Sequence, residues 1–300
     1  QPDVAYEFVK TLVDCGFEWV LVQEHTIELP ENGHGPQAKH LPHRLVVRNS
    51  NGDEASIIAI ISVKFIGQTT RSMLDTGERQ RLADTADIIS EQISRRIRYA
   101  LPGSLRVTND GSCIEYMPLV ATTAYIDLEN NAQVSEIKAV PLSATESFSG
   151  YISIYPLVGN LYNKNNNNGP QTVNIETLPA GTAPVIISLS QPHRFNRASS
   201  QNRLFISADP EAICQDGEWL YLYRGYGFVN NVNQLTAALP GSFATGRQVL
   251  ANSLQVSSLV FSYSPSSQRR NALVAVSFTI ADATGNTLSL GQEVQVRNVP

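Results

Sequence analysis

Between residues 55 and 101, the apolar positions follow a helical period. One apolar stripe recurs every three or four residues, at Leu82, Ala86, Ile89, Ile93, Ile97 and Ala100. Three cations, Arg95, Arg96 and Arg98, lie in the final turns, where positive charge complements the helix dipole. Pro102 and Gly103 follow and terminate the pattern. The pattern predicts one long amphipathic helix over residues 55–101.

After Pro102 the period changes from helical to alternating. Short runs rich in β-branched and aromatic residues are separated by clusters of Gly, Asn, Pro and Ser. Examples are SLRVTNDGSCIEYMPLV, YISIYPLV, RLFISA, EWLYLYRGYGF and ALVAVSFTIAD. These runs predict about ten strands in antiparallel sheets over residues 102–300, which we call the head. The polar stretch NKNNNNGP, residues 163–170, is predicted to be a flexible loop tip.

Residues 1–54 have a third character. The pattern predicts a helix near residues 4–13, a short strand near residues 17–22 and another strand that ends in an Asn51-Gly52 turn. Such a small α/β fragment is too short to bury a core of its own. Four histidines fall in its polar loop, which is interpreted as solvated: His25, His34, His40 and His43.

Composition narrows the class of protein. Hydrophobic residues make up 42% of the 300 residues and charged residues 16%, a balance found in secreted and cell-surface β-proteins rather than in disordered chains. The net charge of −5 provides no basic field for nucleic acid, so nucleic acid is not an expected partner.

The most apolar run in the first hundred residues is ASIIAIISVKFIG. Only nine uncharged residues separate Glu54 from Lys64, whereas a membrane-spanning helix needs about 20. The run is therefore predicted not to act as a membrane anchor. Because no signal peptide is recognisable at Gln1, the natural start is expected to lie upstream.

The three cysteines are Cys15, Cys113 and Cys214, and none belongs to a C-x-x-C pair, so a zinc site is not expected. Cys113 and Cys214 both lie in the strand-rich head. The residues alone leave two alternatives open, a disulfide in an oxidising compartment or two buried free thiols.

Motifs for hydrolytic chemistry, G-x-S-x-G and H-E-x-x-H, do not occur, and a non-enzymatic protein without a cofactor is expected. Four acidic residues surround Cys214 and are interpreted mainly as turn residues: Asp209, Glu211, Asp216 and Glu218. Calcium remains a candidate ligand for these acidic loops, although the usual calcium-loop spacing is absent.

Two further groups of residues are candidates for contacts. Trp219, Tyr221 and Tyr223 alternate along one strand, which predicts either a sheet face packed on the helix or an exposed aromatic surface for a ligand. Arg95, Arg96 and Arg98 are candidate contacts for an acidic partner, or alternatively a solvated helix end. The helix before Gly77 has no obvious cover in this chain, which suggests a partner helix.

One segment resembles a known family. Residues 93–107 read ISRRIRYALPGSLRV and are followed by Cys113-Ile114-Glu115. This order is similar to the helix-to-head junction of the minor pilins and pseudopilins of MSHA-type pilus biogenesis, which carry I-S-R-E-L-R-x-A-L-P-x-S-x-R-V and then C-I-E. RLFISADPEAICQDGEWLYLYRGYGF and GNTLSLGQEVQVRNVP resemble later parts of the same family. The resemblance covers about residues 61–300.

The resemblance implies an α+β fold. A long N-terminal amphipathic helix would pack on a β-rich antiparallel head, preceded here by the small α/β fragment. It implies a non-enzymatic structural role in a type IV pilus or a related secretion filament, with other pilins as partners through the helix. It implies localisation at the bacterial inner membrane, in the periplasm or in the pilus. The family also places cysteines at both points, which favours a Cys113–Cys214 disulfide.

The N-terminal part departs from that family. The pilin signal G-F-T-L-x-E is expected near His43, but HRLVVRNSNGDEAS stands there. Residues 1–60 are therefore interpreted as foreign to the pilin-like sequence. Contact with the inner membrane is expected only if a native anchor replaces them. GFEWVLVQEHT faintly resembles glycoside hydrolases of family 57. The alternative functions are thus a carbohydrate-active hydrolase fragment, or a β-sandwich surface module that binds carbohydrate or another ligand.

Overall fold

The computed structural model describes residues 46–48, 54–129, 131–165, 167–265, 271–282 and 285–296, with side chains from Thr76 onward. The chain divides into two units, Gln1–Glu78 and Arg79–Pro300, and each is described by itself. These bounds differ from the predicted divisions at 54/55 and 101/102. The predicted helix at residues 4–13, the strand at residues 17–22, the four histidines and most of the hydrolase-like segment lie outside the described residues.

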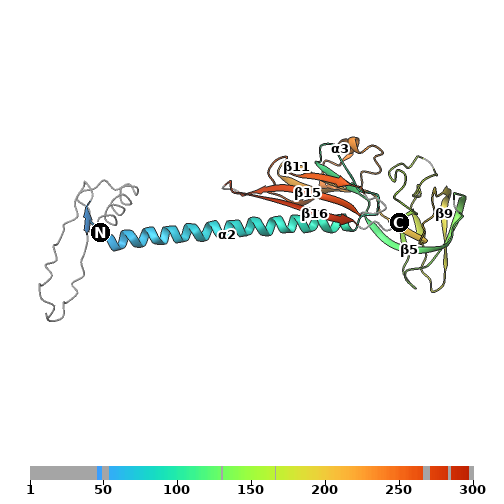
Figure 1. The fold of residues 1–300 in the computed structure, drawn as a ribbon, viewed down its shortest axis with the longest axis horizontal. Coiled ribbons are helices and arrows are strands. Elements are labelled where there is room, and N and C mark those ends of the chain that lie inside the picture. The colour runs from blue at the N-terminus through green and yellow to red at the C-terminus, as the bar shows by residue number, and fades with distance from the viewer. Residues whose placement is uncertain are drawn as a thin grey trace. The chain divides into compact units, whose positions relative to one another are not determined.

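In the first unit, β1 (Val46–Arg48) and β2 (Glu54–Ser56) form an antiparallel pair, with Val47 opposite Ala55. The helix α2 (Ile57–Arg98) begins directly after β2 (Figure 1). The final turns of α2 belong to the second unit.

The second unit contains a five-stranded antiparallel sheet. In spatial order its strands are β13 (Arg247–Ala251), β12 (Trp219–Tyr223), β11 (Glu211–Asp216), β4 (Cys113–Tyr116) and β3 (Arg106–Val107). Three short helices, η1 (Val232–Gln234), α3 (Leu235–Ala238) and η2 (Phe243–Thr245), lie in the connection between β12 and β13.

A three-stranded antiparallel sheet lies next to the five-stranded one. Its strands are β14 (Val260–Ser264), β15 (Ala272–Ala281) and β16 (Thr287–Val296), and β16 is at its edge. The Phe261 N–H of β14 donates to the Gly111 carbonyl in the β3–β4 turn at 2.8 Å. Figure 1 shows β11, β15 and β16 beside the final turns of α2.

The end of α2 forms one core with these two sheets. All six residues of the predicted apolar stripe, from Leu82 to Ala100, are at most 7% exposed. They share a cluster with Ile114 of β4, Leu222 of β12 and Phe278 of β15, among others. Apolar burial of this kind is the main force that holds the helix to the head.

A second core lies inside a six-stranded antiparallel sheet. Its spatial order is β8 (Glu176–Leu178), β7 (Phe148–Ser153), β10 (Arg203–Ser207), β5 (Leu119–Asp127), β6 (Gln133–Ala139) and β9 (Val185–Arg194). The sheet nearly closes on itself, because the Glu176 carboxylate of β8 accepts from the Ser190 N–H and hydroxyl of β9. Ile137, Ile152 and Leu204 are fully buried in its interior.

The predicted α+β, pilin-like fold class is wrong. The structure is 43% strand and 16% helix, so the protein is mostly β. The long helix expected over residues 55–101 corresponds to α2, Ile57–Arg98, and the first buried side chain described in it is Leu82. The prediction gave one regular helical stripe too much weight and counted about ten strands in the head, whereas the described part of the head contains fourteen, β3 to β16. Within the described residues, no helix combines the length and the hydropathy that crossing a membrane requires.

Candidate functional site

The head contains the disulfide that was predicted. Cys113 of β4 and Cys214 of β11 are cross-strand partners, with an S–S distance of 2.04 Å and 4.3 Å between their Cα atoms. They lie in a cluster with Tyr221 and Tyr223, separate from the core that contains α2. The disulfide therefore joins the neighbouring strands β4 and β11 on the sheet face turned away from the helix.

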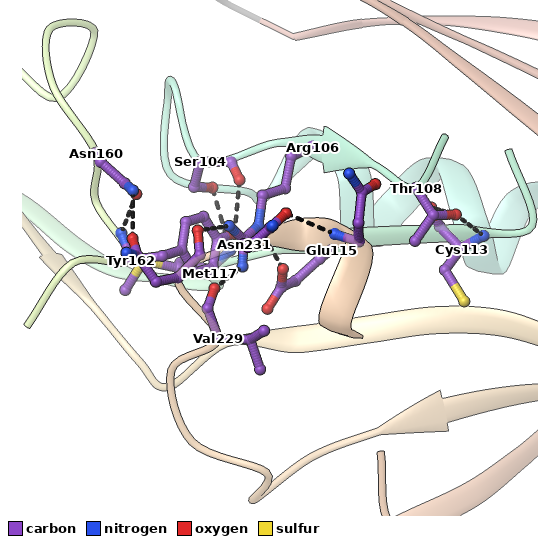
Figure 2. A network of polar contacts seen from close by, with 12 residues as sticks. Ser104, Arg106, Thr108, Cys113, Glu115, Met117, Asn160, Tyr162, Val229 and Asn231 are labelled. Atoms are coloured by element: carbon purple, nitrogen blue, oxygen red, sulfur yellow. Dashed lines mark hydrogen bonds and ion pairs between the residues drawn. The ribbon is translucent and has the colours of Figure 1, made fainter. Parts of the chain in front are cut away.

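A buried ion pair connects β4 to its neighbour β3. Arg106 Nε donates to Glu115 Oε2 at 2.5 Å, and Glu115 has no exposed surface (Figure 2). Burial raises the pKa of the Glu115 carboxyl, while the bonds from Arg106 and from the Tyr226 hydroxyl at 3.1 Å oppose that rise. The carboxylate is desolvated and depends on these two donors.

The same guanidinium connects three segments of the head. Its Nη1 donates to the Asn230 carbonyl at 3.0 Å and its Nη2 to the Val229 carbonyl, and it stacks 3.5 Å from the centre of the Tyr162 ring. The Tyr162 hydroxyl in turn donates to the Ser104 carbonyl at 2.6 Å (Figure 2). Arg106 thus fixes the β12–α3 connection and the β7–β8 connection against β3 and β4.

A second cation is enclosed in the β7–β8 connection. Lys164 Nζ donates to Gln171 Oε1 at 2.5 Å and to the Thr172 carbonyl at 2.7 Å, and it lies 3.9 Å from the Tyr151 ring centre and 4.3 Å from that of Phe228. Burial lowers the pKa of Lys164 to about 7, and the attraction of Asp209 opposes this. We call these five residues, Lys164, Gln171, Thr172, Tyr151 and Phe228, the Lys164 cluster.

The Lys164 cluster is anchored in turn by the six-stranded sheet. Gln171 is 5% exposed, and its Nε2 donates to the Ser207 hydroxyl of β10 at 3.0 Å. The Tyr151 hydroxyl donates to Asp209 at 3.0 Å, and burial together with Asp209 raises the pKa of Tyr151 to about 12. The prediction of a flexible loop tip at residues 163–170 is wrong at Lys164, because its amine turns inward to these acceptors and rings.

Strand β12 carries Trp219, Tyr221 and Tyr223, and these side chains together form neither a face packed on the helix nor an exposed surface for a ligand. Tyr221 and Tyr223 are 8% and 5% exposed, so they are not an open ligand surface, and Trp219 alone of the three is exposed, at 42%. The intervening residues Leu220 and Leu222 face α2 instead. The tyrosines are covered on the opposite face by residues that follow β12, which include Tyr226, Val229 and Leu235.

The acidic residues near Cys214 are dispersed among separate partners. Glu211 accepts from the Tyr116 hydroxyl at 2.7 Å and from Arg224 Nε at 2.5 Å. Asp216 pairs with Arg247 at 3.7 Å. In the part of the chain that the structure describes, no three His, Cys, Asp or Glu residues lie together as metal ligands.

The three arginines that were predicted to contact a partner differ in their surroundings. Arg96 Nη1 donates to the Gln92 carbonyl within the helix at 3.0 Å. Arg95 and Arg98 are exposed and line a groove of about 500 Å³. The other residues of this groove are Glu91, Ser94, Tyr99 and Gln295.

Sequence reasoning missed the Arg106–Glu115 pair and the Lys164 cluster. A signal for the ion pair was present, because the Asn109-Asp110-Gly111 sequence favours a turn, and pairing of the strands on either side of it places Arg106 opposite Glu115. For Lys164 no local signal exists, since its acceptors and rings come from distant elements. Tyr99 directly follows α2 and is 66% exposed, and it was not among the candidate contact residues predicted from the sequence.

Comparison of the chain with protein-family models, curated proteins and solved structures found no match.

Proposed function

We propose that this protein is a non-enzymatic structural subunit of a type IV pilus of the MSHA kind or of a related secretion filament. Its partners in this proposal are other pilin or pseudopilin subunits, which it contacts through α2. Its location is the bacterial inner membrane, the periplasm or the pilus. The proposal concerns assembly and does not rely on the fold class that was corrected above.

The observation that supports the proposal most is the construction of α2. The end of the helix is built into the head through its apolar stripe and through Ser90 and Ser94, whose hydroxyls donate to Gln292 of β16. The same helix begins at Ile57, well before the first described buried position. In its sequence, apolar residues recur every four positions at Ile57, Ile61 and Phe65, as in a stripe that packs against another helix.

The residues that carry the family resemblance also have structural roles in the head. Arg106, Cys113 and Glu115 all belong to the matched motif, and they form the disulfide and the buried ion pair. A disulfide favours a compartment outside the cytoplasm. Both points agree with a subunit whose head must remain folded at the cell surface.

Filament incorporation tests the proposal. Residues 1–60 are replaced by a G-F-T-L-x-E leader and about 18 apolar residues, because membrane insertion requires such a span. The chimera is expressed in piliated bacteria that lack the corresponding minor pilin, and sheared filaments are analysed by immunoblot. We expect the chimera in the filament fraction and the original chain outside it. A processed chimera that stays in the membrane and never enters filaments would contradict the proposal.

A ligand-binding surface is the second candidate function, and it depends on one observation. Trp219 stacks on Tyr221 with ring centres 6.5 Å apart, and the Arg247 guanidinium lies 4.4 Å from the Tyr221 ring and 5.7 Å from that of the exposed Phe243. Exposed aromatic rings beside an arginine suit sugars. The chain has two tryptophans, Trp19 and Trp219. In a Trp19→Phe variant all tryptophan fluorescence comes from Trp219, so its quenching by an added sugar reports binding at this surface. No quenching by a panel of oligosaccharides would remove this candidate.

A further inference from the structure

The groove at the end of α2 carries two positive charges that pair with no carboxylate in the described part of the chain. Arg95 and Arg98 lie three residues apart and therefore share one face of the helix. Neither forms an ion pair with any residue in the described part of the chain. By contrast Arg106, Arg224 and Arg247 each pair with a carboxylate. Among the described residues that line the groove, only Glu91 is acidic.

The walls of the groove are fixed in place. The Tyr99 N–H donates to the Arg95 carbonyl at 3.2 Å, and the Tyr99 carbonyl accepts from the Leu119 N–H at 2.8 Å. Opposite, Ser94 Oγ donates to Gln292 Oε1 at 2.9 Å and holds β16 against the helix. The backbone that forms the groove is therefore in place before a partner binds.

One side of the groove is an open sheet edge. The strand β16 pairs only with β15, so its other edge has no neighbouring strand in the described sheet. Gln295 of β16 is exposed and lines the groove. An edge strand provides backbone donors and acceptors for an added peptide strand.

The spacing of the charges suits an extended acidic ligand. Side chains at positions i and i+3 of a helix lie about 5–6 Å apart. In an extended strand, residues i and i+2 are about 7 Å apart on the same face. Two acidic residues separated by one residue can therefore meet both arginines, while the exposed Tyr99 ring covers the apolar part of the segment.

We propose that this groove binds an extended acidic segment of a neighbouring subunit, with alternate carboxylates on Arg95 and Arg98 and its backbone along β16. This inference rests on the proposed function, since it names the chemistry by which the head meets its neighbour in the filament. The net charge of −5 disfavours binding of a long polyanion, so the proposed ligand is a short acidic segment.

A binding measurement tests the inference without requiring filaments. The probe is a short fluorescent peptide of alternating glutamate and threonine, and anisotropy is recorded with the full chain. We expect saturable binding that weakens with salt. The double variant Arg95→Glu with Arg98→Glu should bind about tenfold more weakly, because two attractive pairs become repulsive. The matched control, Arg79→Glu with Arg81→Glu, makes the same charge change at exposed positions outside the groove and should retain the affinity.

Three results would overturn the inference: no binding of the acidic peptide, equal losses in the two double variants, or equally tight binding of single-stranded oligothymidylate. Circular dichroism of each variant shows whether it has folded. If the peptide binds but the leader chimera never enters filaments, the groove is retained and the filament proposal fails. If the chimera enters filaments but the peptide does not bind, only the groove inference fails.

Discussion

Arg106 and Glu115 form an ion pair in which the carboxylate has no exposed surface and the guanidinium side chain is 17% exposed. They are cross-strand partners in β3 and β4. Tyr226, Val229 and Asn230 satisfy other polar atoms of the pair. A desolvated pair of this kind contributes little net stability by itself, but the loss of one partner leaves a buried charge.

Replacement of Arg106 by methionine should therefore lower the free energy of unfolding by about 3–5 kcal/mol at neutral pH. The matched control is Arg224→Met, which removes an ion pair from Glu211 at the same 2.5 Å distance but with an Arg224 side chain that is 52% exposed. Such an exposed pair is worth about 0–1 kcal/mol. Urea unfolding measures both variants, and equal losses would contradict the role assigned to burial.

The loss in Arg106→Met should also shrink as the pH falls. Burial raises the pKa of the Glu115 carboxyl, and Arg106 opposes that rise. In the variant this opposition is lost, so mild acid protonates the carboxyl and removes the buried charge. Urea unfolding at neutral and mildly acidic pH reveals the trend as a smaller difference from the wild type. A loss that stays constant with pH would mean that the missing packing of Arg106, and not the charge of Glu115, causes it.

Lys164 should make the stability rise with pH. Its folded-state pKa is about 7, below the ordinary value of 10.5, so between these values the unfolded chain binds a proton that the folded chain lacks. The free energy of unfolding contributed by this residue therefore increases from about pH 7 upward and levels off near the unfolded pKa. Lys164→Met should flatten this rise between about pH 7 and 9, whereas the exposed Lys138→Met should keep it. The same slope in Lys164→Met and the wild type would refute the burial of this amine.

Removal of the disulfide should destabilise the head. The double variant Cys113→Ala with Cys214→Ala opens a loop with a sequence separation of 101 residues. The chain-entropy model gives a loss of up to about 4–5 kcal/mol for a loop of this size. Urea unfolding measures it, and Cys15→Ala, which retains the disulfide, serves as the control. A double variant as stable as the control would show that the bond is dispensable.

Substitutions on the buried and exposed faces of α2 should differ in their effect on stability. Ile93 is fully buried, and Ile93→Ala should cost about 2–5 kcal/mol because it leaves a cavity in the core. Ile88 is 56% exposed, and Ile88→Ala should change the stability by less than about 0.5 kcal/mol. Thermal unfolding of the two variants checks this, and similar shifts would place the helix elsewhere.

Local patterns predicted local features of the head well. The period of the helix identified its buried positions from Leu82 to Ala100, since a 3.6-residue repeat fixes one face. The disulfide needed the family resemblance, because the residues alone left free thiols equally open. The orientation of β12 was not predictable: both its aromatic face and its Leu220–Leu222 face are apolar, so alternation does not say which side meets the helix.

Features made by distant segments were out of reach of the sequence. The near-closure of the six-stranded sheet depends on a contact between Glu176 and Ser190 across its two edges. The burial of Lys164 depends on Tyr151 and Phe228, which come from different parts of the chain. Asparagine-rich surroundings normally indicate a solvated turn, and tertiary packing overrode that preference.

The central claim is that α2 packs against the helices of other subunits, and photo-crosslinking in piliated cells tests it most directly. A photoreactive residue replaces Met73, in the part of α2 that precedes the buried stripe, and the control replaces the exposed Lys138 on β6. Both changes are made in the chimera with the leader and anchor. We predict that the Met73 position yields an adduct with a pilin subunit after illumination and that the Lys138 position does not. A membrane-inserted chimera that gives no adduct from position 73, or equal adducts from both positions, would contradict the account.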